Sequence, residues 1–521
     1  MRVDVTATAP VVPHRRIALF GLCLAAGLVW LAFADTGIVL PTIAQELDID
    51  LTDLQWVNNA FSLACGVVVL SAGRFSDVYG RRLVLLIGTV VFGTFGLLSA
   101  FLSGLPGLVT GRALMGIGAA LILPATLALI PVMFDRDSQP GAFGTWMAVA
   151  WVGQAAGPAL GGLLTATVGW RAILWMNAPL AAVAFYLILR YCPESRDAET
   201  PRGVDVAGLL TSALAAFFLL YACTAGQEDG FSSPLILTCF AASAVLWVAF
   251  ILIEARVRNP LVELRLFHAR DFDGALVANL VMNLVFGGIS FVLALYLQDV
   301  RGYSPLVAGC LLLPATLTIL VFNPIGQRIG QHHGPRGPIL SAMYIIALGA
   351  LVAGFLSTTS PYWLLAAGLL VLGTGIGLLS TPLSDTAVAG PPPELAGTAS
   401  GLFKATSMLG GSLGVALLAA ASGAFQTNTG SRLGHQAGLT DEQIDNLRQA
   451  LTASKAGQNQ LAGLSDADRA RVIDGYHQAQ AAGAAGAVKM AAVIALACGL
   501  LLLWLWPRSW HSTADRQTSR R

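Results

Sequence analysis

The sequence predicts an all-α protein that crosses a membrane fourteen times. Its 521 residues are 55% hydrophobic and only 11% charged, whereas about 25% charged residues are usual in soluble proteins. Fourteen apolar runs are each long enough to span the hydrocarbon core of a bilayer as a helix. Arginines gather in alternate connections between these runs, which is typical of a polytopic membrane protein.

The predicted spans follow one another along almost the whole chain. Most connections are short and polar, so neighbouring spans are expected to pack as antiparallel helices. An even number of spans places both ends of the chain on the same side of the membrane. The predicted spans are 17–40, 54–73, 83–103, 106–133, 141–164, 171–190, 206–225, 233–253, 274–298, 305–327, 338–357, 361–383, 397–424 and 487–507.

The distribution of arginine predicts which side the two ends occupy. With the amino terminus inside, twenty arginines fall in inner segments, and the short outer loops hold only Arg171 and Arg301. Positively charged loops remain on the cytoplasmic side of a membrane. Both termini are therefore predicted to be cytoplasmic, in a multi-pass protein embedded in the lipid bilayer of the cell (inner or plasma) membrane.

A weak internal repeat suggests how the spans are grouped. Residues 324–336, after the tenth span, echo residues 73–82, after the second. Echoes of this kind mark transporters built from two related halves, so the seventh and eighth spans are predicted to be an insert. The predicted parts are a cytoplasmic tail (1–16), a six-helix bundle (17–190), a linker with two extra spans (191–272), a second six-helix bundle (273–507) and a second tail (508–521).

The second bundle contains a long outer segment, 425–486. Thr440 to Gln443 resembles a helix capping box, and a second helical pattern begins at Ser465. We expect two short amphipathic helices that lie over the outer surface as a solvated cap. A role in substrate binding is the alternative.

The connection after the second span carries an unusual set of residues. It contains Gly73, Asp77, Gly80, Arg81 and Arg82. Glycine permits a tight turn, and ion pairs at a helix end can be made and broken at low cost. The segment is predicted to act as a cytoplasmic gate; a loop that only fixes topology is the alternative.

Several motifs, in order along the chain, resemble those of the major facilitator superfamily, and within it the fourteen-helix drug:proton antiporter family. This resemblance implies a major facilitator fold, with two six-helix bundles plus two inserted central helices, and transport by alternating access. The matching segments are Trp56–Phe61, Gly73–Arg82, Arg112–Ala120, Gly153–Gly162, Trp170–Arg171 with Asn177 and Pro179, Tyr296–Gln298, Gly302–Pro305 and Ala308–Gly309.

Ionisable residues inside the predicted spans are the strongest functional candidates, because placing a charge in the bilayer is costly. Asp35 and Arg112 both lie about six residues inside the outer ends of their spans, roughly 9 Å deep at 1.5 Å per residue. We expect them to face one cavity and to couple proton binding to conformation; a static ion pair is the alternative. Lys404 lies nearer the inner end of its span, and its long side chain is expected to reach water.

The fifth span is predicted to be a tightly packed, bent helix. Gly153, Gly157 and Gly161 have the spacing that lets helix backbones approach closely, Gly162 adds a fourth small residue, and Pro158 favours a bend. The resemblance associates this motif with exporters. Such a helix could seal the outer side between two bundles.

Polar residues within the spans are candidates for the few polar contacts in an otherwise apolar substrate cavity. Buried amides also join helices, which is the alternative for each of them. The candidates are Asn58, Asn59, Gln154, Asn279, Asn283 and Gln298.

Other functions are disfavoured by the sequence. The seven histidines lie outside the apolar runs and the seven cysteines have no metal-ligand spacing, so no metal or cofactor is expected. The sequence contains no phosphate-binding loop, which argues against an ATP-driven pump. The net charge of +1 suggests no nucleic-acid partner. The expected partners are a small-molecule substrate and protons, and the chain is expected to be monomeric and not an enzyme.

These features together predict a proton-coupled antiporter that exports hydrophobic or amphipathic small molecules, as in multidrug or antibiotic efflux. A dedicated exporter of a single metabolite or antibiotic is the first alternative. A membrane-embedded sensor or enzyme is the second, although it would need clustered reactive residues that the sequence does not show.

Overall fold

The computed structural model describes most of the chain, and every regular element in the described part is helical. The described residues are 14–49, 51–102, 104–135, 138–196, 205–257, 260–262, 264–268, 270–389, 396–436 and 466–505. The all-α prediction is therefore confirmed for these residues.

The helices correspond one to one with the predicted spans, with a few short additions. α7 and α8 together form one span, and the π-helix η2 continues α11. The elements are α1 (Arg15–Ala34), α2 (Leu40–Leu47), α3 (Leu51–Tyr79), α4 (Arg81–Phe101), α5 (Gly104–Met133), α6 (Gln139–Thr167), α7 (Arg171–Trp175), α8 (Asn177–Tyr191), α9 (Val206–Asp229), α10 (Pro234–Glu254), η1 (Leu264–His268), α11 (Arg270–Leu295), η2 (Tyr296–Val300), α12 (Pro305–His333), α13 (Arg336–Ala353), α14 (Tyr362–Ala389), α15 (Ala396–Gln436) and α18 (Asp466–Leu505).

Length and apolarity identify most of these helices as membrane spans. Among the described residues, 12 helices are long and apolar enough to cross a bilayer, or 13 when the bent helix α6 is included. α3 corresponds to the second predicted span and is 29 residues long, but it is not among these helices. The class of protein is confirmed, and the count of fourteen spans is not.

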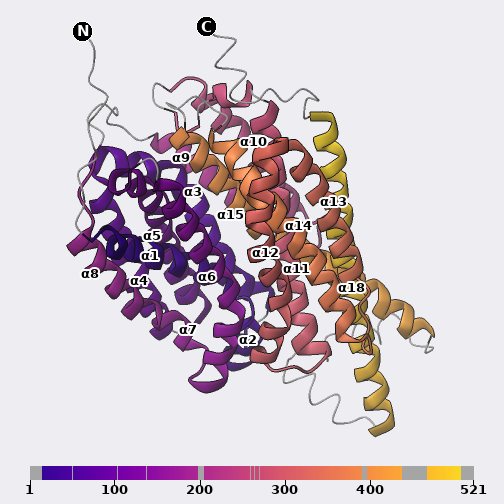
Figure 1. Cartoon of the computed structure of the whole chain (residues 1–521). Helices are drawn as coiled ribbons and strands as arrows, with labels where there is room; N and C mark the ends of the chain where they lie inside the picture. Colours follow the sequence, from indigo (N-terminus) through magenta and orange to yellow (C-terminus); the bar gives the residue numbers. More distant parts are fainter. Residues whose placement is uncertain are drawn as a thin grey trace, which may run out of the picture.

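The spans form two six-helix bundles that lie side by side (Figure 1). The first bundle contains α1, α3, α4, α5, α6 and the α7–α8 pair, and the second contains α11 to α15 and α18. The bundles meet along two seams, where α6 packs against α12 and α3 packs against α15. Small residues permit these contacts; a side chain at Gly66 of α3, for example, would collide with Met408 of α15.

The inserted helices α9 and α10 pack against each other beside the seam between the bundles. α9 contacts both α3 and α15. Trp56 of α3 lies against Phe217 and Tyr221 of α9, with ring centroids 5.6 and 6.1 Å apart. The insert thus packs along the α3–α15 seam.

The start of α9 is fixed by two buried carboxylates. Asp205 is the N-cap, and its Oδ1 accepts a hydrogen bond from the Gly208 amide at 2.8 Å. Glu254, at the end of α10, accepts from the Val262 amide at 3.1 Å through Oε2. Gly208 leaves room for both acids, because a β-carbon there would lie 2.5 Å from Glu254 Oε1 and 2.6 Å from Asp205 Oδ2.

Replacing Asp205 with alanine is expected to destabilise the insert by about 1 kcal/mol, because it removes the N-cap acceptor. Asp205→Asn keeps an acceptor and removes one of two neighbouring negative charges, so it should preserve stability. Thermal unfolding in one detergent would compare the variants with the wild type. Equal melting temperatures for Asp205→Ala and the wild type would contradict a stabilising cap.

The breaks after α3 and α12 each contain a glycine with positive φ. α3 and α4 are separated by Gly80 at φ 117°, and α12 and α13 by a break that begins with Gly334 at φ 82°. Positive φ at both positions requires glycine. The expectation of a loop over residues 73–82 is wrong, because α3 continues through Tyr79 and α4 begins at Arg81.

The long outer segment is more helical than expected. α15 continues to Gln436 and α18 begins at Asp466, so both helices extend beyond the predicted spans; Figure 1 shows α18 reaching past the bundle at the lower right. The second helical pattern is therefore not a separate helix lying over the surface, but the first part of α18. The first pattern, at 440–443, lies outside the described residues.

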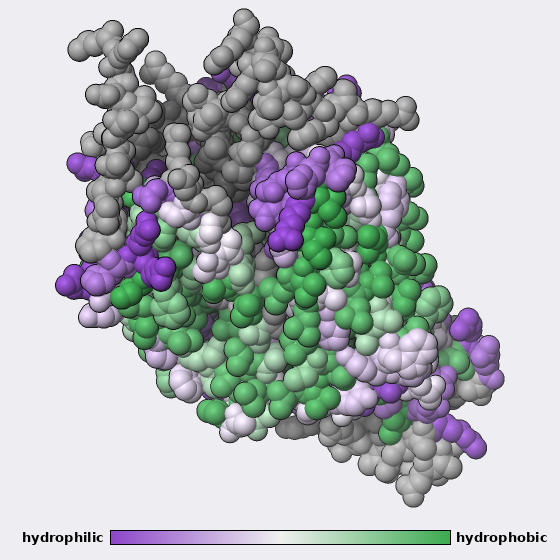
Figure 2. All heavy atoms as spheres, viewed as in Figure 1, coloured by the Kyte–Doolittle hydropathy of each residue, from purple (hydrophilic) through white to green (hydrophobic). Residues whose placement is uncertain are grey.

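The outer surface of the helices is apolar over a broad belt (Figure 2). Large hydrophobic side chains are exposed on it, including Phe101 at 76%, Val245 at 67% and Val493 at 64%. An apolar belt of this extent would be unstable in water, whereas lipid tails solvate it. The protein is a multi-pass membrane protein.

Candidate transport site

A cavity lies between the two bundles. Its wall is formed by residues of α1, α3 and α6 from the first bundle and of α11, α12, α14 and α15 from the second. None of the lining residues is ionisable. The lining residues are Trp30, Phe33, Ala34, Gly37, Ile38, Asn58, Ser62, Gln154, Pro158, Asn283, Phe286, Gly287, Ile289, Ser290, Phe291, Ala294, Gly309, Leu312, Leu313, Ala315, Thr316, Leu369, Leu372, Ser407, Met408, Gly411 and Val415.

Three of the six predicted cavity amides line this space, namely Asn58, Gln154 and Asn283. They come from α3, α6 and α11, so they surround the cavity from both bundles. Together with a few hydroxyl groups they supply polar contacts in an otherwise apolar wall, which is the usual composition of a small-molecule site.

The other three amides lie elsewhere. Asn279 is buried and donates to the Phe403 carbonyl at 2.6 Å, to Thr406 and to Ser407, so it joins α11 to α15. Gln298 donates to the Ile38 carbonyl at 3.0 Å, across the boundary between the bundles. Asn59 is fully buried, and neither atom of its amide has a hydrogen-bond partner.

Asp35 and Arg112 are both fully buried, and neither lines the cavity. Arg112 donates to the carbonyls of Ala32 at 2.8 Å and Val57 at 3.3 Å, and its guanidinium lies 4.4 Å from the Phe61 ring centroid. Its charge interacts with that of Asp35, but no direct ion pair joins them.

The Asp35 carboxylate is only partly satisfied. Oδ1 accepts from the Thr36 hydroxyl at 2.8 Å, whereas Oδ2 is buried without a hydrogen-bond partner. A buried carboxylate oxygen without a partner is costly when the group is charged.

Helix α6 is bent by 41° between Gln154 and Ala156, as the predicted proline bend requires. Its glycines face two neighbours. Gly153, Gly157 and Gly161 pack against α1, where a side chain at Gly161 would lie 2.7 Å from the Asp35 carbonyl. Gly162 packs across the boundary instead, against Pro305 and Leu306 of α12.

One end of the boundary between the bundles is closed. At this end, which the sequence predicts to be outer, Gln298 bonds to Ile38 and the backbone at Gly162 lies against Leu306. Gly309 of α12 lies against the backbone of Pro158 in the same way. These close contacts hold α6 against α12 along this part of the boundary.

The same end carries a polar cluster within the first bundle. Glu46 accepts from the Trp170 indole at 2.7 Å and from the Arg171 guanidinium. The hydrogen bond from Arg171 holds the pKa of the Glu46 carboxyl below its usual value. The cluster joins α2 to the start of α7.

The opposite, arginine-rich end contains the predicted gating residues and a partner that the sequence analysis missed. Glu194 accepts from the amides of Arg82 at 3.1 Å and Leu83 at 3.2 Å, and so caps α4. Gly80 leaves room for this carboxylate, which a β-carbon there would approach to 2.8 Å. The side chain of Asp77 lies outside the described part of the structure.

The arginines at this end are also anchored to α8 and the residues after it. Arg82 Nη2 donates to the Leu189 carbonyl at 2.5 Å, and the Arg81 amide donates to the Ser195 carbonyl at 2.8 Å. An acid just beyond the end of a span, as Glu194 is, was the only sequence signal that could have suggested this cap.

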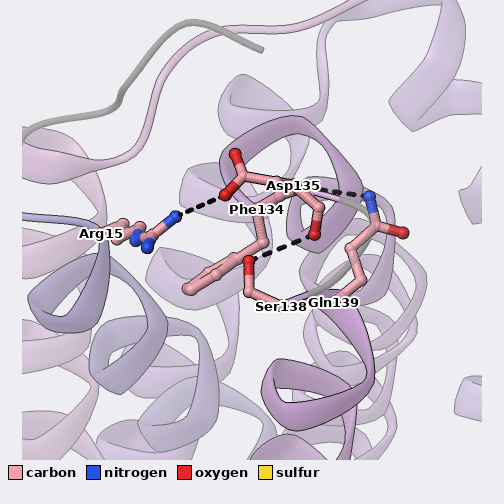
Figure 3. Close-up of polar contacts among 5 residues, drawn as sticks. All are labelled: Arg15, Phe134, Asp135, Ser138 and Gln139. Atoms are coloured by element: carbon pink, nitrogen blue, oxygen red, sulfur yellow. Dashed lines mark hydrogen bonds and ion pairs between the residues drawn. The ribbon is translucent and has the colours of Figure 1, made fainter. Parts of the chain in front are cut away.

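A second tie at the same end joins α1 to the connection between α5 and α6 (Figure 3). Arg15 pairs with Asp135 at 3.2 Å, and its guanidinium lies 5.5 Å from the Phe134 ring centroid. Ser138 and Gln139 donate to the carbonyls of Asp135 and Phe134, which holds the turn. Both charges are exposed, so the pair contributes little to stability.

Removal of the Glu194 cap is expected to loosen the start of α4. Glu194→Ala should cost about 1 kcal/mol, the usual value for an N-cap, and should raise hydrogen exchange at the amides of Arg82 and Leu83 about fivefold. Glu194→Gln keeps an acceptor but not the charge that favours a helix N-terminus, so its effect should be smaller. Unchanged exchange in Glu194→Ala would exclude a capping role.

Lys404 lies beside the cavity wall. Its ammonium is 4.7 Å from the ring centroid of Trp30, which lines the cavity. The side chain is partly exposed. The expectation that it reaches water at the end of its span stays a prediction.

Two six-helix bundles with a cavity between them define the class of protein as a membrane transporter. Comparison with known families identifies it further. The family model of the Major Facilitator Superfamily matches residues 20–415. The chain belongs to this superfamily, whose members are transporters and not enzymes.

Similar curated proteins are named for drug resistance. The multidrug resistance protein Stp of Mycobacterium tuberculosis is 33% identical over 413 residues, covering 78% of this chain and 76% of the relative. The puromycin resistance protein pur8 of Streptomyces alboniger is 35% identical, covering 78% and 81%. The tetracenomycin C resistance and export protein of Streptomyces glaucescens is 31% identical, covering 76% and 74%.

Solved structures share the fold. A bacterial homologue of the human lysosomal transporter Spinster, in an inward-facing and unoccupied conformation, matches with a TM-score of 0.63 and 17% identity, covering 95% of this chain and 99% of that one. A peptide transporter matches with a TM-score of 0.64 and 14% identity, covering 97% and 99%. At these identities the likeness concerns the fold alone.

Proposed function

We propose that this protein is a proton-coupled antiporter that exports hydrophobic or amphipathic small molecules by alternating access. The observation that carries the proposal is an apolar cavity between two bundles, closed at one end and adjacent to the buried acid Asp35. Drug resistance and export among similar proteins support small-molecule export as the task.

Helix α6 provides a route from proton binding to the closed end. One face of α6 contacts the backbone of Asp35 through Gly157 and Gly161, and the adjacent face contacts α12 through Pro158 and Gly162. A proton on Asp35 removes the cost of a buried charge and so changes which conformation is favoured. Movement of α1 would then shift α6 and open or close the contact with α12.

Arg112 has a positioning role in this scheme. It donates to the backbone of α1 at Ala32 and of α3 at Val57, and so holds these two helices together beside Asp35. Breaking these bonds as α1 moves would change the surroundings of the Asp35 carboxyl group and with them its affinity for a proton. In this proposal Asp35 and Arg112 act through a conformational cycle.

The arginine-rich end is proposed to be the cytoplasmic gate. The cap of Glu194 on α4 and the pair of Arg15 with Asp135 hold segments of the first bundle together at this end. Gly73, Gly80, Arg81 and Arg82 lie where such contacts would loosen or form as the bundles rock. We propose that both termini are on this side of the cell membrane and that one chain suffices for transport.

Transport by the purified protein in proteoliposomes tests the proposal. Imposing a proton gradient should drive uptake of a hydrophobic dye against its concentration gradient, and a protonophore should abolish it. Accumulation that needs no gradient would contradict proton coupling. A panel of unrelated compounds then separates a multidrug pump from an exporter of one antibiotic, since only the former would accept several.

A further inference from the structure

Lys404 places a positive charge next to the cavity wall. Its ammonium lies over the face of Trp30, 4.7 Å from the ring centroid, and Trp30 itself lines the cavity. Ser407 and Met408 also line the cavity, and they lie three and four residues further along α15. These spacings place Lys404 on the same face of the helix, one turn away.

No carboxylate neutralises this lysine in the part of the chain that the structure describes. Among the described residues its ammonium forms no ion pair and no hydrogen bond. The ring of Trp30 attracts a cation but accepts none of its three N–H groups in the way an oxygen does. The Cys65 thiol of α3 is an ionisable neighbour, and it is buried.

The remaining charges near the cavity offset each other. Asp35 and Arg112 are both fully buried, both lie outside the cavity wall, and their charges interact. The lining contains no acid that could attract a cationic substrate. A single uncompensated ammonium therefore sets the sign of the potential that a bound molecule meets.

We propose that Lys404 selects acidic amphiphiles as cargo, so that an apolar body occupies the cavity while a carboxylate, sulfonate or phenolate approaches the ammonium. This proposal rests on the proposed export function and names the charge of its substrate. An anion would provide the acceptors that the ammonium lacks, through charge-assisted hydrogen bonds. A cation would be repelled at the same position, in a setting where water screens the repulsion poorly.

Matched probes test the preference directly. 1-Pyrenesulfonate and 1-pyrenemethylammonium share one aromatic body and carry opposite charges, and 1-pyrenemethanol is the neutral control. Fluorescence anisotropy with the full chain in detergent measures binding without requiring transport. The wild type should bind the sulfonate about tenfold more tightly than the ammonium probe, a difference of about 1.4 kcal/mol.

Three variants assign the preference to Lys404. Lys404→Met should bind both charged probes alike, Lys404→Arg should retain the preference for the sulfonate, and Lys404→Glu should reverse it. Trp30→Leu removes the ring that holds the ammonium and should weaken the preference for the sulfonate. If Lys404→Met does not fold, this variant tests the proposal in its place. Equal binding of the two probes by the wild type, or a preference that survives in Lys404→Met, would overturn the proposal.

The outcome is separable from that of the proposed function. A wild type that prefers the sulfonate but shows no gradient-driven transport would contradict proton-coupled export and support the charge selection. A wild type that transports the two charged probes equally well, with a proton gradient, would support export and overturn the charge selection.

Discussion

Replacement of Asp35 by asparagine is expected to abolish gradient-driven transport while leaving substrate exchange intact. Asparagine has nearly the same shape but cannot bind or release a proton, so the proposed link between the gradient and the conformation is lost. The rate of uphill transport in proteoliposomes should fall by about 100-fold, a typical loss when a proton-transferring group is removed. Substrate counterflow, which needs no proton, should continue.

The environment of Asp35 explains why the effect should be so large. The carboxyl group is fully buried, its Oδ2 has no partner, and Gly157 and Gly161 bring α6 against the backbone of Asp35. Ionising such a group costs several kcal/mol more than ionising one in water. In the proposed cycle the wild type overcomes this cost each time Asp35 releases its proton, whereas the amide of the variant carries no charge in any state.

Controls separate coupling from folding. Asp53→Asn makes the same chemical change at an exposed position in the first turn of α3 and should leave transport unchanged. Loss of both counterflow and uphill transport in Asp35→Asn would indicate a damaged fold instead. Uphill transport with an unaltered pH dependence would exclude Asp35 as the coupling group.

The sequence was a good guide to the helices and a partial guide to the site. A long run of apolar residues in a membrane must satisfy its backbone hydrogen bonds within the segment, so each run predicted a helix. Gly80 and Pro158 acted as predicted, because positive φ and a missing amide donor are local properties. The extension of α15 beyond the bilayer was missed, and the helical pattern that begins at Ser465 was assigned to a separate helix instead of to the first part of α18.

Contacts between distant helices could not be read from the sequence. Asn279 and Asn283 share one face of α11, yet Asn279 bonds to α15 while Asn283 lines the cavity. Glu194 and Lys404 acquire their roles from α4 and from Trp30, far away in the chain. Spacing within one helix identifies a face, but only the packing decides what that face meets.

Replacement of Gly162 by valine is expected to stop transport, because it would prevent the bundles from closing at the predicted outer end. A β-carbon at this position would lie 2.6 Å from the Leu306 amide nitrogen and the Pro305 carbonyl oxygen. These are backbone atoms at the start of α12, which cannot turn away as a flexible side chain can. The bundles would therefore have to separate, and the transport rate should fall by about 100-fold, since the cycle requires both closed ends.

Gly144→Val is the matched control on the same helix, because no atom lies within 4 Å of a β-carbon at Gly144. A cysteine introduced into the cavity by Asn58→Cys reports which end is open. Labelling of the protein that has only its native cysteines is the background to subtract. In the Gly162→Val background it should react faster with a membrane-impermeant maleimide added from the predicted outer side. Transport by Gly162→Val at the wild-type rate would show that the cycle does not depend on this contact.

The two predictions together test whether α6 transmits the proton signal. Gly157 and Gly161 touch Asp35, and Gly162 touches α12, so both contacts belong to one rigid stretch beyond the bend. If this stretch moves as a unit, Asp35→Asn should change the labelling of the cavity cysteine, and Gly162→Val should remove that change. Independent effects of the two substitutions on labelling would mean that the coupling runs through another helix.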